Sequence, residues 1–173
     1  GQNSRGLHRN SFGSAHPNPH LIVAAYPVQL LALVDSRTHF PPRIIDPKNM
    51  SETLRGAAVI GQSGGPTVVI NQSLVGYIEA AKEAGCITRV LGARHGVKGM
   101  LEGDLIDLGA ETSELLERIA KVPAAALGSV RMKPGPEDVA KVIETFKRYD
   151  IRYFFYIGGN DTAETAHIVE QVS

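Results

Sequence analysis

The sequence predicts an α/β fold, a Rossmann-like three-layer sandwich in which helices cover both faces of a mainly parallel sheet. From residue 56 onward, short apolar runs alternate with segments of about 10 to 15 residues that have helical periodicity. Three of the apolar runs end in polar or glycine-rich clusters, as expected where the carboxyl ends of parallel strands form a binding edge. At 173 residues, with 43% hydrophobic and 21% charged residues, the chain has the composition of one soluble globular domain.

Four apolar runs have the length and composition of buried strands, and the last is the richest in aromatic and branched residues, which favour extended structure. Between and after them, apolar residues recur at helical spacing; Gly85 and Pro136 stand where one helix ends and another begins. The expected strands are 57–62, 87–92, 124–129 and 151–159. The inward-facing residues of the expected helices are Ile70, Leu74, Tyr77, Ile78 and Ala81; Leu115, Leu116 and Ile119 in 113–122; Val139, Val142, Ile143 and Phe146 before Tyr149; and Ala163, Ala166 and Ile168 in 163–172.

The composition changes near residue 50. Six of the ten prolines and four of the six histidines precede Met50, whereas glycine is concentrated after it. We interpret residues 1–49 as a non-native or disordered extension that is dispensable, and residues 50–173 as the functional part. The alternatives are a genuine flexible extension and an extra short strand. The apolar run at 21–34 is shorter than the roughly 20 residues of a membrane span and contains Pro27.

Net charge and cysteine content argue against several classes of partner. The 18 basic and 18 acidic residues balance, so the chain has no overall electrostatic attraction to nucleic acid or to an anionic membrane. An anionic ligand must therefore meet a local site. The single cysteine, Cys86, has no partner for an intramolecular disulfide, which fits a reducing compartment such as the cytoplasm.

Three polar or glycine-rich clusters directly follow predicted strands: QSGGPT (62–67), GSVRMK (128–133) and GGNDT (158–162). If the strands are parallel, all three clusters meet at one edge of the sheet. Gly64 and Gly65 would let backbone amides approach a phosphate with no Cβ in the way. A strand-to-helix turn also needs glycine, and the cluster matches neither G-x-G-x-x-G nor G-x-x-x-x-G-K-[ST].

Side chains of the second and third clusters have chemistry suited to a phosphate ligand. Arg131 can hold two phosphoryl oxygens at once, and Lys133 adds a second, more flexible positive charge. Asp161 can bind a metal ion through its carboxylate, whereas Asn160 offers only a neutral amide oxygen. Arg131 could equally be an ordinary surface arginine, and Asp161 or Thr162 could cap the following helix, a role compatible with ligand binding.

The segment from about Gly56 to Ser173 resembles the 6-phosphofructokinase family, and within it the pyrophosphate-dependent branch. The resemblance rests on SGGPTVVIN at the first turn, LGSVRMKP after a middle strand and IGGNDTAET at the last motif, all in register. Family members that use ATP typically have Gly-Gly-Asp-Gly-Ser at the last motif, where the second glycine leaves room for the nucleotide. Asp161 stands at that place here. Because the resemblance covers roughly the first third of such an enzyme, we expect an N-terminal fragment.

The resemblance implies phosphoryl transfer from pyrophosphate to the 1-hydroxyl of fructose 6-phosphate, with Mg²⁺ as the cofactor. It implies that Arg131 bridges donor and acceptor, and that Asp161 obstructs ATP and so selects pyrophosphate. Asn160 replaces the family's metal-associated aspartate, and we expect the metal near Asn160 and Asp161. The residues expected to bind the phosphate donor are Gly64, Gly65, Arg131, Lys133, Gly159 and Thr162. His95 and Lys98, in an expected loop over the entrance at 92–101, are weaker candidates.

The chain also departs from the family pattern. Residues 66–69 replace the usual Asp-x-Pro-Gly, although Asn71 keeps its place. The aspartate that acts as general base belongs to a Thr-Ile-Asp-Asn-Asp segment expected beyond Ser173, so we expect the fragment to be inactive alone. By resemblance, the full-length protein is a cytoplasmic, homo-oligomeric enzyme of glycolysis. The alternatives are an ATP-dependent 6-phosphofructokinase and a non-catalytic regulatory subunit of the same fold; a lipid or NAD kinase would lack LGSVR in this register.

Overall fold

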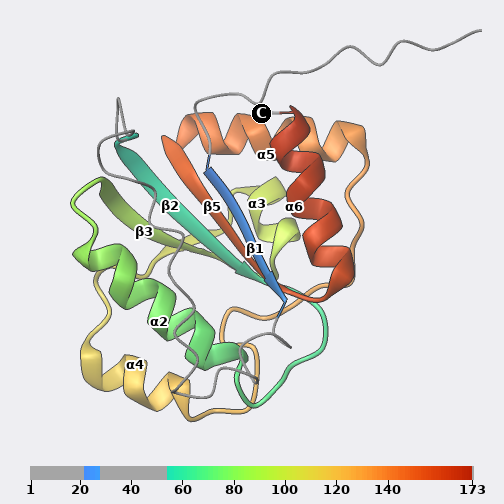
Figure 1. Cartoon of the computed structure of the whole chain (residues 1–173). Coiled ribbons are helices and arrows are strands. Elements are labelled where there is room, and N and C mark those ends of the chain that lie inside the picture. Colours follow the sequence, from blue (N-terminus) through green and yellow to red (C-terminus); the bar gives the residue numbers. More distant parts are fainter. Residues whose placement is uncertain (1–21, 28–53, 173) are drawn as a thin grey trace, which may run out of the picture.

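The computed structural model describes residues 54–172 and, for the backbone only, residues 22–27. Its strands are β1 (Ile22–Pro27), β2 (Gly56–Gln62), β3 (Ile87–Ala93), β4 (Leu105–Asp107) and β5 (Ile151–Gly158). They form one sheet in the order β1-β5-β2-β3-β4, shown in Figure 1. The first four strands of that order run parallel to one another, and β4 is antiparallel to β3.

Helices cover both faces of this sheet. On one face lie α2 (Ile70–Glu83) and α4 (Ser113–Ala120), and on the other lie α3 (Val97–Glu102), α5 (Pro136–Arg148) and α6 (Asn160–Val172) (Figure 1). Each face has its own buried apolar core. The α2 face is built from residues such as Ile60, Leu74, Ile78 and Leu116, and the α5 face from residues such as Val59, Val142, Phe154 and Val169. The predicted three-layer α/β sandwich is confirmed.

The position of the central strand β2 explains why its sequence is a continuous apolar run. All seven residues of β2 are buried, because β5 and β3 flank it and helices cover both of its faces. A strand in that position reads as a continuous apolar run instead of an alternating one. Helix α5 begins with Pro136 at its first turn, and the Gly135 N–H donates to the Asp138 carboxylate at 3.1 Å.

The prediction of a strand at 124–129 is wrong. Buried side chains bind the backbone groups that a neighbouring strand would have taken: the Leu127 N–H donates to Gln62 Oε1 and the Ala126 N–H to Asn71 Oδ1, each at 2.9 Å. The Leu127 carbonyl accepts from the His95 N–H at 2.8 Å. Gly128 then turns the chain with a φ of 72°, in the left-handed region. The segment is therefore an irregular turn held against the end of β2.

The expected loop at 92–101 also differs from the structure. The chain completes β3, turns at His95 and Gly96, forms α3 and returns as the short antiparallel strand β4. A Cβ at Gly96 would lie 2.7 Å from the Tyr156 hydroxyl oxygen, so this tight turn requires glycine. The segment extends the sheet and its helical layer.

Most of residues 1–49 lie outside the described part of the chain. Six of them, Ile22–Pro27, form β1, which pairs in parallel with β5 from Ile22 opposite Tyr153 to Pro27 opposite Gly158. This is the extra short strand that the sequence left open as an alternative. The interpretation of the remainder as non-native or disordered stays a prediction. Among the helices that the structure describes, none is long and apolar enough to cross a membrane.

Candidate functional site

The three clusters that follow the predicted strands meet in one cleft. We call it the donor cleft, because the residues expected to bind the phosphate donor line it. It has a volume of about 500 Å³ and lies where the carboxyl ends of β2 and β5 meet the segment after residue 128. Gly65, Arg131 and Asp161, expected at one edge of the sheet, all line it. The full lining is Ser63, Gly64, Gly65, Val130, Arg131, Met132, Lys133, Gly159, Asn160, Asp161 and Thr162.

Two glycine positions leave open space along the cleft. A Cβ built at Gly65 or at Gly159 would meet no heavy atom within 4 Å, whereas Gly64 has a φ of 76° that favours glycine. The backbone there is therefore accessible to a ligand. The helix behind the first loop, α2, begins only at Ile70, so the helix whose positive N-terminal end borders the cleft is α6.

Helix α6 begins three residues earlier than the sequence predicted. Asn160, Asp161 and Thr162 belong to its first turn, and the Thr162 and Ala163 N–H groups donate to the Gly159 carbonyl at 3.1 and 3.2 Å. Asp161 is thus inside the helix instead of capping it. Its side chain is 78% exposed and is free to contact a ligand in the cleft.

Thr162 has a different environment from its two neighbours. It is only 3% exposed, and a Cβ at Gly158 would lie 2.2 Å from its hydroxyl oxygen and 2.9 Å from the Ser63 carbonyl oxygen. Gly158 is therefore required for the close approach of β5, the glycine loop and α6. The burial of Thr162 indicates that it shapes the wall of the cleft more than it contacts a ligand.

Lys133 bridges two carboxylates at the rim of the cleft. Its Nζ lies 3.1 Å from Glu164 Oε2 and 3.3 Å from Asp161 Oδ1. The hydrogen bond to Glu164 and the smaller effect of the hydrogen bond to Asp161 raise the pKa of the Lys133 ammonium. Lys133 therefore stays charged throughout the neutral range. All three side chains are more than half exposed, so the pairs set geometry more than stability. Glu164 was not among the predicted site residues, although its i,i+3 spacing from Asp161 on a helix could have indicated it.

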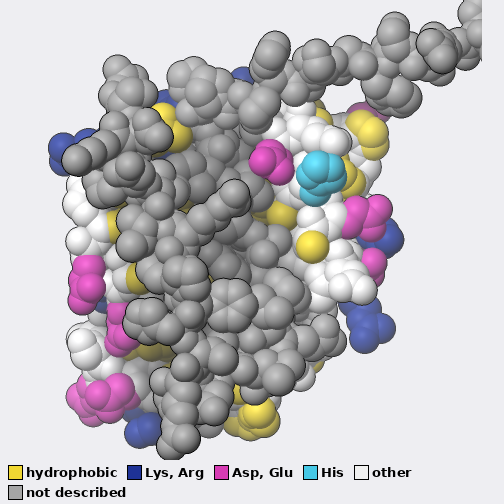
Figure 2. Space-filling model, in the orientation of Figure 1, with side chains coloured by type: hydrophobic (Ala, Val, Ile, Leu, Met, Phe, Trp, Pro, Cys, Tyr) yellow, Lys and Arg dark blue, Asp and Glu magenta, His cyan; other side chains and the backbone are white. Residues whose placement is uncertain are grey.

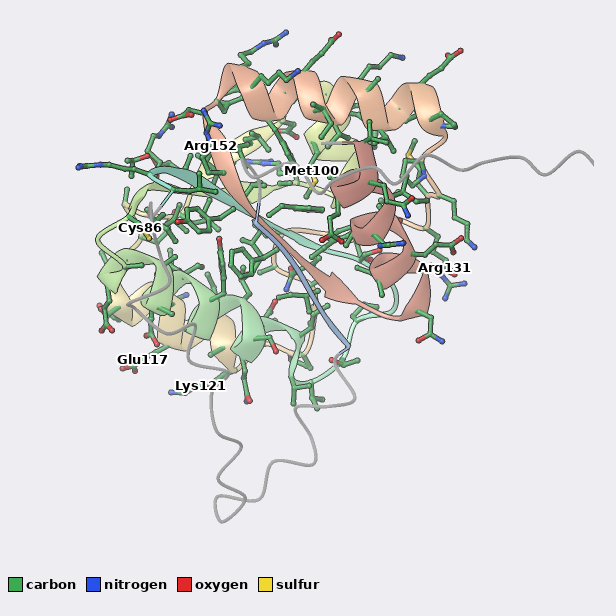
Figure 3. All side chains as sticks on the ribbon, turned by 45° about the horizontal axis from the view of Figure 1, so that its top comes forward. Cys86, Met100, Glu117, Lys121, Arg131 and Arg152 are labelled. Atoms are coloured by element: carbon green, nitrogen blue, oxygen red, sulfur yellow. The ribbon has the colours of Figure 1, made fainter. Side chains whose placement is uncertain are left out.

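Arg131 makes no ion pair with a described carboxylate. It is exposed, lines the cleft and lies near the start of α6 in Figure 3. The preceding residue is tied to the glycine loop, because Ser63 Oγ donates to the Val130 carbonyl at 3.4 Å. A guanidinium without a carboxylate partner is available to bind an anion. Charged side chains of both signs lie mainly around the margins of the view in Figure 2, in keeping with the balanced net charge.

The described residues offer few side-chain ligands for a magnesium ion. In residues 54–172 no group of three or more His, Cys, Asp or Glu side chains could hold a metal ion. Asn160 and Asp161 both line the cleft, and the Asp161 carboxylate is paired with Lys133. Mg²⁺ prefers oxygen ligands and commonly keeps several waters while binding substrate phosphates. The residues present fit an ion that arrives with the phosphate ligand, and do not form a complete protein cage.

The two weaker candidates lie outside the cleft lining. His95, with a φ of 54°, packs on Gly128, where a Cβ would lie 2.5 Å from its Nδ1 atom. Lys98 is paired with Glu102 at 3.9 Å along α3. Neither of them belongs to the residues that line the donor cleft.

The comparisons with known proteins identify the family of this chain. The phosphofructokinase family model matches residues 57–173. The pyrophosphate–fructose 6-phosphate 1-phosphotransferases of Rhodospirillum rubrum and Methylococcus capsulatus are 43% and 42% identical over 117 and 122 residues, which are 68% and 67% of this chain. A crystal structure of a pyrophosphate-dependent phosphofructokinase from Nitrosospira multiformis matches with a TM-score of 0.65 and 44% identity, over 68% of this chain and 30% of that one.

The fold and the cleft thus define an α/β protein with an open cleft at the carboxyl ends of its parallel strands. The chain belongs to the phosphofructokinase family. It spans about 29% of the length of the curated relatives that it matches, and the matched region begins after β1.

Proposed function

We propose that the chain forms the phosphate-donor half of a pyrophosphate-dependent 6-phosphofructokinase. In this reaction the 1-hydroxyl oxygen of fructose 6-phosphate attacks one phosphorus of pyrophosphate, the bridging P–O bond breaks, and fructose 1,6-bisphosphate and phosphate form reversibly. The observation that supports this most directly is the donor cleft, in which Gly65, Arg131 and Asp161 come together from three separate segments. The names of the relatives support pyrophosphate as the donor.

In this proposal, the backbone around Gly64, Gly65 and Gly159 binds donor phosphate, because no side chain blocks its approach there. The N-terminal end of α6 adds a favourable dipole. Arg131 bridges donor and acceptor and neutralises charge that develops on the transferred group. Phosphoryl transfer needs little covalent help from the protein, so this positioning and charge neutralisation account for most of the catalysis.

Lys133 provides a second cation that can move from its carboxylate partners to pyrophosphate. Asp161 fills the space into which the nucleoside side of ATP would extend and repels its α-phosphate, so it selects pyrophosphate. When bound, Mg²⁺ supplies charge neutralisation on the phosphate oxygens; Asn160 and Asp161 would contact it directly or through water. We expect the general base and most sugar-phosphate contacts outside the described residues. We also propose that the whole enzyme is a cytoplasmic homo-oligomer of glycolysis.

Two measurements test the proposal. Calorimetry of this chain in MgCl₂ should detect binding of pyrophosphate. Arg131→Ala should weaken that binding, and ATP should bind more weakly than pyrophosphate does. A chimera in which residues 57–173 replace the equivalent segment of the Rhodospirillum rubrum relative should transfer phosphate from pyrophosphate to fructose 6-phosphate. A chimera that prefers ATP would support the ATP-dependent alternative, and a folded chimera without activity would favour the non-catalytic regulatory one.

A further inference from the structure

We propose that the buried amide pair Gln62 and Asn71 positions Arg131 in the donor cleft by fixing the backbone segment 122–128 that precedes it. Both side chains are 0% exposed, and neither lines the cleft. They are therefore positioning residues that act through Arg131. The inference rests on the proposed function, in which Arg131 binds donor phosphate.

The two amides form one continuous network with that segment. Gln62 Nε2 donates to Asn71 Oδ1 at 3.0 Å, which joins the end of β2 to the first turn of α2. Gln62 Oε1 accepts from the Leu127 N–H, and Asn71 Oδ1 accepts from the Ala126 N–H, both at 2.9 Å. Asn71 Nδ2 donates to the Val122 carbonyl at 3.0 Å. Every polar atom of the pair is thus used, as buried polar groups require.

This network replaces regular secondary structure in the segment that leads to Arg131. Between the end of α4 and the start of α5, the described chain contains no helix and no strand. An irregular segment has no ladder of its own to fix its position, so the side-chain bonds at 122–127 determine where it lies. Arg131 follows Leu127 by four residues. A functional guanidinium needs such support, because small displacements of a binding group cost affinity and rate.

Gln62 also fixes the position of the glycine loop relative to the segment that carries Arg131, and these two segments form two walls of the cleft. It is the last residue of β2 and directly precedes Ser63 and the glycine loop. One side chain therefore sets the position of the Arg131 segment relative to the loop that meets the same ligand. The hydrogen bond from Ser63 to the Val130 carbonyl, at 3.4 Å, is a weaker second tie between the same two segments.

The decisive variant is Gln62→Met, which keeps the length of the side chain and removes both of its hydrogen-bonding atoms. Gln72→Met is the matched control, because Gln72 is exposed on α2 and does not line the cleft. Pyrophosphate binding to this chain in MgCl₂ is measured by calorimetry, below the melting temperature of each variant. We expect Gln62→Met to raise the Kd by about tenfold, the order expected when one well-placed charged hydrogen bond is lost. The control should change the Kd less than twofold.

A double-mutant cycle separates positioning from a general effect on the fold. In an Arg131→Ala background, Gln62→Met should no longer weaken pyrophosphate binding, because the residue through which it acts is gone. Hydrogen exchange of the Ala126 and Leu127 amides should accelerate in Gln62→Met and not in Gln72→Met. Asn71→Ala removes the bonds to Ala126 and Val122 and leaves the Gln62 bond to Leu127 in place, so it tests the network from its other end if Gln62→Met does not fold.

The outcomes are distinguishable. Weaker binding by Gln62→Met or Asn71→Ala that disappears in the Arg131→Ala background supports the inference. Unchanged binding, or equal weakening in both backgrounds, overturns it and leaves the proposed function standing. If the unsubstituted chain does not bind pyrophosphate, the proposed function fails and the positioning role fails with it.

Discussion

At the scale of single residues, we propose Asp161 as the position on which donor choice depends. Its carboxylate lines the cleft, is 78% exposed and lies 3.3 Å from Lys133. Because α6 begins at Asn160, Asp161 is not required as the helix cap, and its negative charge in the first turn is favourable in any case. A substitution of Asp161 removes this charge but no capping hydrogen bond, so we expect it to cost the helix about 1 kcal/mol and to leave the fold intact.

We expect Asp161→Gly, in the chimera with the Rhodospirillum rubrum relative, to lower the rate with pyrophosphate and to raise the rate with ATP. The rise should be about tenfold if roughly 1.4 kcal/mol of repulsion is removed. Asp161→Asn is the matched control, because it keeps the size of the side chain and removes its charge. A glycine variant with an unchanged ratio of kcat/KM for the two donors would contradict the assignment of Asp161 as the donor filter.

Asn160 gives a second, related prediction. In the Asp161→Gly background, Asn160→Asp should raise the rate further, because a carboxylate holds Mg²⁺ better than an amide oxygen does. The measurement is the Mg²⁺ concentration that gives half-maximal rate, which should fall. If it does not fall, the metal is held by the donor phosphates and water without help from this position.

Glu164 allows the role of Lys133 to be measured. Glu164→Gln removes the carboxylate nearest to the Lys133 ammonium, at 3.1 Å, and lowers the negative charge at the rim of the cleft. We expect pyrophosphate to bind two- to threefold more tightly at low salt, with the gain shrinking as salt screens these exposed charges. Glu144→Gln on α5 changes the net charge equally and is the control. Weaker binding in Glu164→Gln would mean that Glu164 holds Lys133 in its binding position.

At the scale of elements, the sequence predicted best where one segment determines its own structure. The strands β2, β3 and β5 are short apolar runs, and the helices α2, α4 and α5 have apolar residues at helical spacing. The structure confirms them to within a few residues. The segment 124–129 is apolar enough for a strand, but its hydrogen-bond partners are the side chains of Gln62 and Asn71, more than 50 residues away. No local pattern contains that information. The three-residue strand β4 likewise depends on pairing with β3.

The helix α2 gives a prediction about stability. The Tyr77 hydroxyl is buried without a hydrogen-bond partner in the described part of the chain, while its ring packs on Phe155 with centroids 4.3 Å apart. Burial raises the pKa of Tyr77 well above its ordinary value of about 10. We expect Tyr77→Phe to stabilise the fold by about 1 kcal/mol, because it removes an unsatisfied polar group and keeps the ring.

The same substitution should change the response to alkali. A raised folded-state pKa means that the folded chain keeps a proton that the unfolded chain loses, so the contribution of Tyr77 is complete below pH 10 and is lost as the pH rises further. Thermal unfolding between pH 8 and pH 11 should therefore show a smaller alkaline loss in Tyr77→Phe than in the unsubstituted chain. Tyr149→Phe is the control, and an equal alkaline loss in both variants would contradict this prediction.

At the scale of the whole molecule, the three clusters that form the donor cleft could be predicted to meet because parallel strands bring their carboxyl ends to one edge. The cleft lining bears this out for Gly65, Arg131 and Asp161. The placement of β1 could not be predicted in this way. Its sequence lies in a segment of different composition, and its partner β5 is more than 120 residues away in the chain. Composition therefore predicted a dispensable extension where the fold contains an edge strand.

Deletion of residues 1–49 tests whether this extension is dispensable, as its composition predicts, or needed for the fold, as the pairing of β1 with β5 indicates. β1 pairs with β5 along six residue positions and also lies against α6, so removing residues 1–49 would leave one edge of β5 open. An open edge presents unpaired backbone groups, and β5 is the aromatic-rich segment IRYFFYIG, which makes intermolecular pairing favourable. We expect the deletion to lower the Tm by several degrees and to cause self-association in sedimentation experiments. Deletion of residues 1–21 keeps β1 and should do neither. If the longer deletion also leaves the Tm and the sedimentation unchanged, β1 contributes nothing to the fold and the extension is dispensable, as its composition predicts.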